Sequence, residues 1–204
     1  MSDGSGSITL VLGGVRSGKS RFAQDLVAAV GGEQVTFVAT AHAGDQEMSD
    51  RIEHHQQSRP ASWTTIESPL NVGRRLAAVE QLSPVVLLDC LTLLVSNVLC
   101  QPDCPEDQEL CQQQVLDEVN ALIQVAQQRS LHLVIVSGEV GSGIVPEHRL
   151  GRLFRDLLGF ANQHLAAVSD RVYLLVAGQA IDVKQIGVSV EDAARQVAPL
   201  KVQS

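Results

Sequence analysis

The residues best suited to chemistry in this sequence are a lysine and a serine that follow a glycine-rich stretch. They complete the spacing Gly13-x-x-x-x-Gly18-Lys19-Ser20, the pattern of a phosphate-binding loop. The glycines let the backbone approach a phosphate, Lys19 supplies positive charge to the β- and γ-phosphates, and the Ser20 hydroxyl can ligate Mg²⁺. A helix that begins near Lys19 adds its backbone N–H groups and its dipole. The pattern predicts a phosphate site and leaves the reaction open.

An acid that can complete a magnesium site is expected at the end of an apolar strand beside the strand that precedes the loop. Asp89 closes the run VVLLD and is the candidate for this role. The alternative is that Asp89 caps the helix that follows, and the two roles are compatible.

A histidine pair lies on a polar helical pattern between residues 42 and 60. Met48, Ile52 and His55 share one face of this helix, and His54 lies about 100° around the axis, so it is the more accessible imidazole. A neutral imidazole can attack the α-phosphorus of a nucleotide and form a covalent intermediate. A solvated helix face without chemistry is the alternative.

Five apolar runs are predicted to form strands, which must position the candidate site residues. The runs are 8–12, 35–40, 85–90, 131–137 and 171–178. Helical patterns lie between them, which predicts an α/β fold with a mainly parallel sheet flanked by helices, of the P-loop NTPase, RecA-like type. Residues 100–107 form a loop between a helix that ends near Leu99 and one from about Glu109 to Arg129. A short helix is expected at 190–197.

Composition narrows the class of protein. The chain has 204 residues, of which 45% are hydrophobic, so one domain over 1–204 is expected, with 1–7 and about 185–204 peripheral. The net charge of −8 argues against binding to nucleic acid. No apolar run approaches the roughly 20 residues that span a bilayer, and the first residues do not resemble a signal peptide, so a cytoplasmic protein is expected.

The four cysteines do not form a recognisable metal pattern. The gaps between Cys90, Cys100, Cys104 and Cys111 match no zinc motif, and thiols of a protein without an export signal stay reduced. Cys90 ends an apolar run and is interpreted as a small buried hydrophobe.

Five separated motifs together resemble those of one family. They are GGVRSGKSRFA at 13–23, ATA at 39–41, DRIEHHQQSRPASWTTIE at 50–67, LLDCLTLLVSN at 87–97 and GEVGSGIVPEHRLGRLFRDLLGFANQHLA at 138–166. Their order is that of the bifunctional adenosylcobinamide kinase / adenosylcobinamide-phosphate guanylyltransferase family of cobalamin biosynthesis. The resemblance extends from about Ile8 to Lys184.

The resemblance implies two reactions. Members phosphorylate the aminopropanol hydroxyl of adenosylcobinamide with ATP or GTP and Mg²⁺, then transfer GMP from GTP to that phosphate through a guanylylated histidine, here His54, with His55 as the second choice. It also implies a homo-oligomer, a trimer. The residues expected at the nucleotide or its metal are Gly13, Gly14, Val15, Arg16, Ser17, Gly18, Lys19, Ser20, Ala39, Thr40, Ala41, His55, Gln56, Gln57, Ser58, Glu67 and Asp89, with Ser20 and Asp89 at the metal.

The corrinoid body of such a substrate needs a broad surface, and the small-residue segment 138–146 is the candidate edge, with a helix cap at 146–150 as the alternative. Two other functions stay open at this point. One is an ordinary small-molecule kinase with an inert histidine pair, and the other is a non-catalytic or switch-type RecA-like ATPase.

Overall fold

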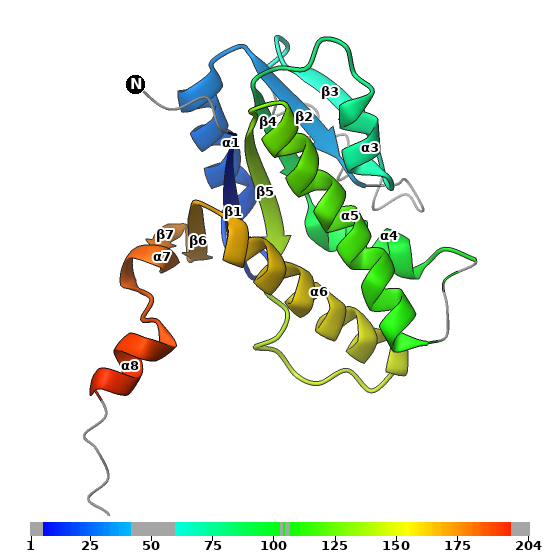
Figure 1. Ribbon diagram of the computed structural model, residues 1–204, viewed down its shortest axis with the longest axis vertical. Coiled ribbons are helices and arrows are strands. Elements are labelled where there is room, and N and C mark those ends of the chain that lie inside the picture. Colours follow the sequence, from blue (N-terminus) through cyan, green and yellow to red (C-terminus); the bar gives the residue numbers. More distant parts are fainter. Residues whose placement is uncertain (1–5, 42–59, 103, 105–106, 197–204) are drawn as a thin grey trace, which may run out of the picture.

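The computed structural model describes residues 6–41, 60–102, 104 and 107–196 (Figure 1). The predicted helix with His54 and His55, and the residues Gln56, Gln57 and Ser58, lie outside the described residues. In the described part, no helix combines the length and apolarity needed to cross a membrane.

One seven-stranded sheet organises the structure, with strand order β3-β2-β4-β5-β1-β6-β7. Strand β7 is antiparallel to β6, and the other neighbouring strands are parallel. The first strand in sequence lies between β5 and β6. The strands are β1 (Ser7–Gly13), β2 (Val35–Ala39), β3 (Thr64–Glu67), β4 (Val85–Asp89), β5 (His132–Gly138), β6 (Arg171–Val176) and β7 (Gln179–Asp182).

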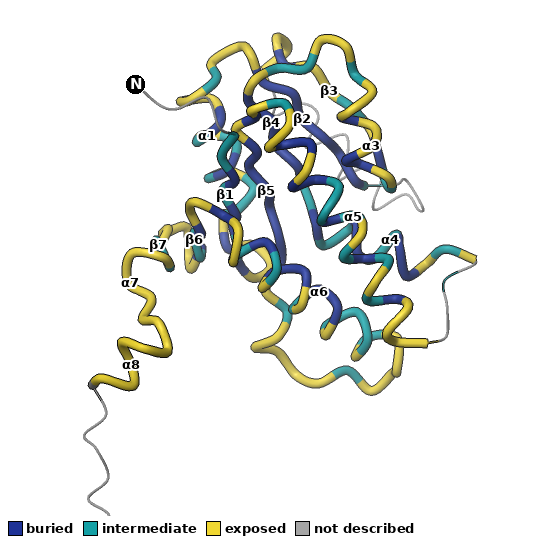
Figure 2. The backbone as a smooth tube through the Cα atoms, viewed as in Figure 1, coloured by how far each residue is buried: buried dark blue, intermediate teal, exposed yellow. Residues whose placement is uncertain are grey.

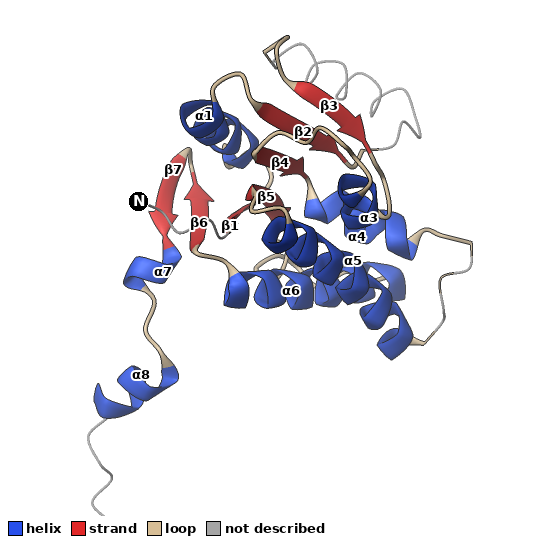
Figure 3. Cartoon of the chain, turned by 45° about the horizontal axis from the view of Figure 1, so that its top comes forward, coloured by secondary structure: helices blue, strands red, loops and turns tan. Residues whose placement is uncertain are grey.

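Helices cover both faces of the sheet (Figure 3). Helix α1 packs on one face, where Ala23 and Val27 meet Phe37 and other apolar strand residues. The opposite face is covered by α3, α4, α5 and α6. The bounds are α1 (Lys19–Gly31), α3 (Val72–Ala77), α4 (Leu91–Leu99), α5 (Gln108–Gln128), α6 (Arg149–Val168), α7 (Val183–Ile186) and α8 (Val190–Gln196).

Burial explains why the central strands form. Consecutive residues of β4 face opposite sides of the sheet, so Leu88 packs under α4 and α5 while Leu87 packs under α1. Both side chains are fully buried, and the central strands are correspondingly dark in Figure 2. A parallel strand covered by helices on both faces must be apolar along its whole length. The predicted α/β fold, with a mainly parallel sheet flanked by helices, is confirmed.

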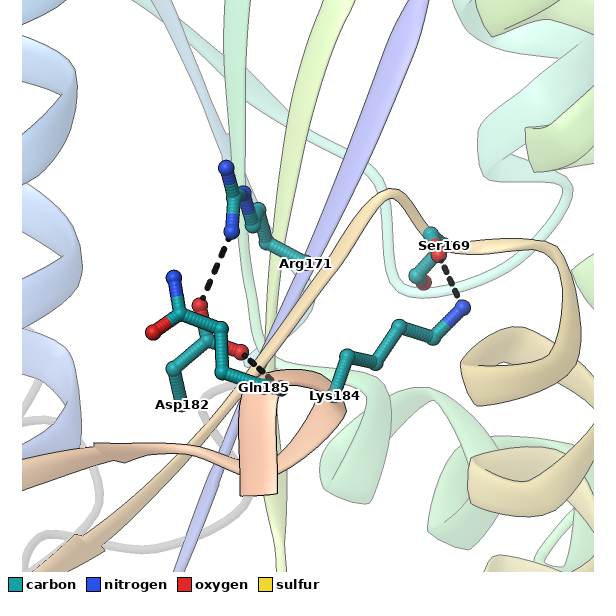
Figure 4. A network of polar contacts seen from close by, with 5 residues as sticks. All are labelled: Ser169, Arg171, Asp182, Lys184 and Gln185. Carbon is teal, nitrogen blue, oxygen red and sulfur yellow. Dashed lines mark hydrogen bonds and ion pairs between the residues drawn. The ribbon is translucent and has the colours of Figure 1, made fainter. Parts of the chain in front are cut away.

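The chain leaves the sheet through a short anchored segment. Arg171 Nη1 lies 3.1 Å from Asp182 Oδ2, and Asp182 Oδ1 accepts a hydrogen bond of 3.2 Å from the backbone N–H of Gln185 (Figure 4). Lys184 Nζ donates to the carbonyl oxygen of Ser169. Beyond this network, α8 extends away from the sheet and is exposed (Figures 1 and 2). The predicted short helix at 190–197 is confirmed as far as Gln196.

Candidate active site

The strand ends that carry the predicted site residues lie along one edge of the sheet. Gly13 at the end of β1 is in register with Gly138 at the end of β5. Ala39 at the end of β2 is in register with Glu67 on one side and with Asp89 on the other. In open α/β sheets, ligands bind outside the carboxyl ends of the strands, so this edge is the candidate active site.

The loop from Gly13 to Ser20 connects β1 to α1 and has the backbone shape that its glycines permit. Gly18 adopts a left-handed φ of 94°, and the preceding Arg16 also has a positive φ, of 57°. A Cβ on Gly13 would lie 2.4 Å from the Ser17 hydroxyl oxygen. A side chain at Gly13 would therefore push into the loop, and glycine is required there for the turn to close.

The polar side chains of this loop suit an anion. Lys19 Nζ donates a hydrogen bond of 3.1 Å to the Gly14 carbonyl oxygen, which places the ammonium group across the loop. The Ser17 hydroxyl is buried and has no hydrogen-bond partner in the described part of the chain. An unpaired buried hydroxyl is costly, and a phosphate oxygen held by the loop would accept its hydrogen bond. The residues present therefore fit a nucleotide phosphate.

Two later segments fasten the loop in place. The Gly178 N–H, in the turn between β6 and β7, donates to the Ser17 carbonyl oxygen at 2.9 Å. The Glu139 N–H, directly after β5, donates to the Gly13 carbonyl oxygen at 3.1 Å. Neither contact was predicted, because a backbone N–H leaves no signal in the residue types of a motif. Gly178 lies outside the quoted motifs, and Glu139 was considered only as part of the candidate corrinoid edge 138–146.

Thr40 links the ends of β2 and β4. Its side chain is fully buried, and its hydroxyl donates a 2.7 Å hydrogen bond to the Cys90 carbonyl oxygen and accepts one of 2.8 Å from the Cys90 N–H. Asn97 Nδ2 donates to the Thr40 carbonyl oxygen at 2.8 Å and to that of Pro69 at 2.9 Å. Thr40 was predicted to border the nucleotide. In the structure, both hydrogen bonds of its hydroxyl go to the backbone of Cys90, directly after β4. Asn97 is a positioning residue that the sequence analysis missed, although it lies in a quoted motif.

The pKa of the Cys90 thiol is affected by two charged residues of the candidate site, Asp89 and Lys19. Burial, and then the negative charge of Asp89, raise the pKa of the Cys90 thiol to about 11, while the positive charge of Lys19 acts in the opposite direction. Both charges therefore act on one sulfur at the end of β4. Cys90 is partly buried and packs against the core beneath α1, close to the small buried hydrophobe that was predicted.

Two expectations about Asp89 need correction. The strand β4 does not lie beside β1, because β5 lies between them. The N-cap of α4 is Cys90 and not Asp89, so the capping alternative is wrong. The apolar run VVLLDC identified a buried strand correctly, but the order of strands in a sheet is set by crossovers that a single run does not reveal.

The residues present also fit a magnesium ion held with a nucleotide. Ser20 offers a hydroxyl at the start of α1, and Asp89 offers a carboxylate at the end of β4. The described residues contain no group of three or more histidine, cysteine, aspartate or glutamate side chains placed to hold a metal by themselves. Mg²⁺ typically binds one or two protein ligands, with phosphates and water completing its octahedron.

The segment between β5 and α6 rims the same edge and is held by two arginines of α6. Arg155 Nη2 donates to the Gly141 carbonyl oxygen at 2.7 Å, and Arg152 Nη1 donates to that of Pro146 at 3.1 Å. Between these anchors, the side chains of Ile144 and Val145 are 97% and 61% exposed. The alternative of a helix cap at 146–150 holds in part, because His148 is the N-cap of α6 but makes no side-chain capping bond.

Comparison with known proteins identifies the family. Residues 9–183 match the model of the CobU family, described as cobinamide kinase / cobinamide phosphate guanyltransferase. The chain belongs to this family. The match covers the phosphate-binding loop, the histidine pair, β4 and α6, so it includes every motif on which the resemblance was based.

Three curated relatives support the assignment. The bifunctional adenosylcobalamin biosynthesis protein CobU of Escherichia coli K12 is 41% identical over 181 residues, which cover 86% of this chain and 98% of the relative. The protein of the same name from Salmonella typhimurium is 40% identical, with the same coverage. The bifunctional adenosylcobalamin biosynthesis protein CobP of Pseudomonas aeruginosa is 39% identical over 175 residues, which cover 86% of this chain and 96% of the relative.

Two solved structures align with this chain at low sequence identity. A KaiC-like protein of Pyrococcus horikoshii OT3 aligns with a TM-score of 0.46 and 12% identity, covering 83% of this chain and 71% of its own. The flagellar accessory protein FlaH of Methanocaldococcus jannaschii aligns with a TM-score of 0.46 and 12% identity, covering 86% and 75%.

Proposed function

We propose that this protein phosphorylates the aminopropanol hydroxyl of adenosylcobinamide, using ATP or GTP, and then transfers GMP from GTP to the new phosphate to give adenosylcobinamide-GDP. The observation that carries the proposal is the family match over residues 9–183, which contains the complete loop Gly13–Ser20. The match supports this proposal over the two alternatives raised by the sequence, an ordinary kinase with an inert histidine pair and a switch-type ATPase.

The kinase step depends on position and charge. The loop backbone and Lys19 hold the β- and γ-phosphates, and the substrate hydroxyl oxygen attacks the γ-phosphorus in line with the departing β-phosphate oxygen. Lys19 neutralises charge that develops on the transferring group. Ser20 and Asp89 would hold a Mg²⁺ ion, which would supply positive charge to the phosphates.

The guanylyl step uses a different phosphorus atom. We assign the nucleophile to His54, with His55 as the second choice, and both residues lie outside the described part of the chain. An imidazole nitrogen forms a bond to the α-phosphorus of GTP and pyrophosphate leaves. A phosphate oxygen of the substrate then attacks the same phosphorus, the phosphorus–nitrogen bond breaks, and the imidazole is restored.

The other assignments in this proposal follow the family motifs. The corrinoid body lies against the rim between β5 and α6, where the exposure of Ile144 and Val145 supports an apolar contact. The protein works as a homo-oligomer, a trimer, and in the cytoplasm. The nucleotide is bordered by the loop residues and by Ala39, Thr40, Ala41, His55, Gln56, Gln57, Ser58, Glu67 and Asp89.

A labelling experiment tests the covalent step. The full-length protein is incubated with GTP labelled in the α-phosphate, denatured, and examined for retained label. We expect acid-labile, alkali-stable label in the wild type, none in His54→Ala, and largely retained kinase activity in that variant, because γ-phosphoryl transfer does not pass through imidazole. His55→Ala is the matched control and should still take up label. Loss of label in His55→Ala alone would move the nucleophile to His55, and unchanged label in both would reject the covalent mechanism.

A further inference from the structure

Two cysteine side chains, Cys104 and Cys111, lie against each other, and the proposed function uses neither of them. Cys104 Sγ and Cys111 Sγ are 3.4 Å apart. Cys104 is partly buried in the connection between α4 and α5, and Cys111 is fully buried in the first turns of α5. Because the sulfur atoms of a disulfide are about 2.05 Å apart, small rotations of the two side chains would bring them to bonding distance.

The fold holds both cysteines in this arrangement. Asp107 is the N-cap of α5, and its carboxylate accepts hydrogen bonds from the N–H groups of Glu109 at 2.8 Å and Leu110 at 3.1 Å. The Cys111 N–H donates to the Asp107 carbonyl oxygen at 3.1 Å. On the other side, the Cys104 N–H donates to the Gln101 carbonyl oxygen at 3.0 Å. A helix cap at Asp107 and a turn at Gln101 thus hold the two sulfur atoms close together.

Other roles for this pair fit less well. Two thiolates provide only half of a tetrahedral zinc site, and the described residues contain no cluster of three or more potential metal ligands. Cys100 is exposed and lies at the end of α4, and Cys90 lies at the other end of that helix. The pair formed by Cys104 and Cys111 is therefore the arrangement best placed for thiol chemistry.

We propose that Cys104 and Cys111 form a reversible disulfide when the protein meets hydrogen peroxide. The more accessible Cys104 sulfur attacks one peroxide oxygen, the O–O bond breaks, and Cys104 becomes a sulfenic acid while water leaves. The Cys111 sulfur then attacks the Cys104 sulfur, its proton joins the departing hydroxide, and a second water forms. Both thiols are oxidised and the peroxide is reduced, and a dithiol reductant reverses the reaction.

Mass spectrometry of the full-length protein tests this pairing. The folded protein is treated with hydrogen peroxide, blocked, and cleaved after glutamate, which separates the two cysteines because Glu106 and Glu109 lie between them. We expect a linked peptide pair that dithiothreitol resolves. The Cys100→Ser variant should form the same link, because Cys100 takes no part. A link between Cys100 and Cys104, or two unmodified thiols at peroxide doses that oxidise Cys100, would overturn the proposal.

Two further variants test the order of events. In Cys111→Ser, the sulfenic acid on Cys104 should persist and react with a dimedone probe, whereas Cys104→Ser should leave Cys111 unmodified. Probe capture at Cys111 instead of Cys104 would reverse the assigned roles and contradict the proposal.

The contribution of the fold is tested separately. Asp107→Ala removes the side-chain cap of α5 but no thiol, and it should slow disulfide formation several-fold. The protein unfolded in urea should lose the preference for this pair, since the Cys100–Cys104 loop is then shorter and closes more readily. The same pairing at the same rate in the folded protein, the Asp107→Ala variant and the unfolded chain would refute the geometric argument.

Discussion

The link between β2 and β4 leads to a quantitative prediction for Thr40→Val. Valine keeps the approximate size of threonine but removes both hydrogen bonds to Cys90, of 2.7 Å and 2.8 Å. Thr40 is fully buried, so the N–H and carbonyl groups of Cys90 lose partners that water does not easily replace. At about 1–3 kcal/mol for each group left unpaired, less the gain from burying an extra methyl group, the expected loss is about 2–4 kcal/mol. For a chain of this size, that lowers Tm by about 10 °C.

Urea unfolding followed by circular dichroism measures this loss, and Thr36→Val is the matched control. Thr36 lies on β2, four residues before Thr40, and is also buried, but its hydroxyl accepts a single bond of 3.3 Å from the Ser83 N–H. The control should lose about 1 kcal/mol or less. Equal losses in the two variants would refute the reasoning, because the cost would then reflect burial of a hydroxyl and not the link between the strands. Nucleotide affinity can be measured for both variants at urea concentrations below their unfolding transitions. A reduced affinity in Thr40→Val alone would show that the hydrogen bonds between Thr40 and Cys90 support the candidate active site.

Three other predictions concern the candidate active site. Lys19→Ala should lower the rate of cobinamide phosphorylation more than about a hundredfold, since it removes about 3 kcal/mol of charge stabilisation, and a γ-phosphate transfer assay that finds a loss of only a few-fold would contradict the role of the loop. Asp89→Asn should raise the magnesium concentration needed for half-maximal kinase activity about tenfold, and an unchanged magnesium titration would remove Asp89 from the metal site. The pKa of Cys90 in the folded state is about 11, above its ordinary value of 9.0, so the thiol ionises in the unfolded state first as the pH rises, and the stability of the ligand-free protein should fall between pH 9 and 11. The Cys90→Ser variant should lose less stability over this range. Equal decreases in the urea midpoints of the wild type and the variant would contradict the raised pKa.

The parts of the fold that the sequence predicted are those with a continuous apolar signal. The five predicted strands correspond to β1, β2, β4, β5 and β6, whose boundaries differ by one or two residues. Strands β3 and β7 were missed because they are short edge strands in which most side chains are exposed, so no apolar run marks them. The helix that ends near Leu99 and the helix from about Glu109 were predicted correctly, since Asp107 caps the second of them. Of the predicted loop at 100–107, residues 103, 105 and 106 lie outside the described residues.

The features of the site that depend on residue type could be predicted from the sequence. Those that depend on contacts between distant segments could not. The phosphate-binding loop follows from glycines, a lysine and a serine at fixed spacing. In the structure, Gly18 has a left-handed φ, and a Cβ on Gly13 would lie too close to its neighbours. The engagement of Thr40 with Cys90, and of Asn97 with two carbonyl groups, depends on which strands become neighbours. That information lies in the crossovers between β1, β2 and β4, and local sequence patterns do not encode it.

The place of β1 in the sheet has a consequence for the order in which the protein can fold during synthesis. Among the described strands, β1 pairs with β5 and β6, which are translated more than a hundred residues after it. The Ser17 carbonyl oxygen receives its bond from Gly178 about 160 residues further along the chain, which at 5–20 residues per second is about 10–30 s of translation. The phosphate-binding loop is therefore synthesised long before its last contact can form. During that interval the apolar residues of β1 lack the strands with which they pair. A chain interrupted before the turn at Gly178 would carry the whole nucleotide motif in its sequence and still lack the contact that closes it.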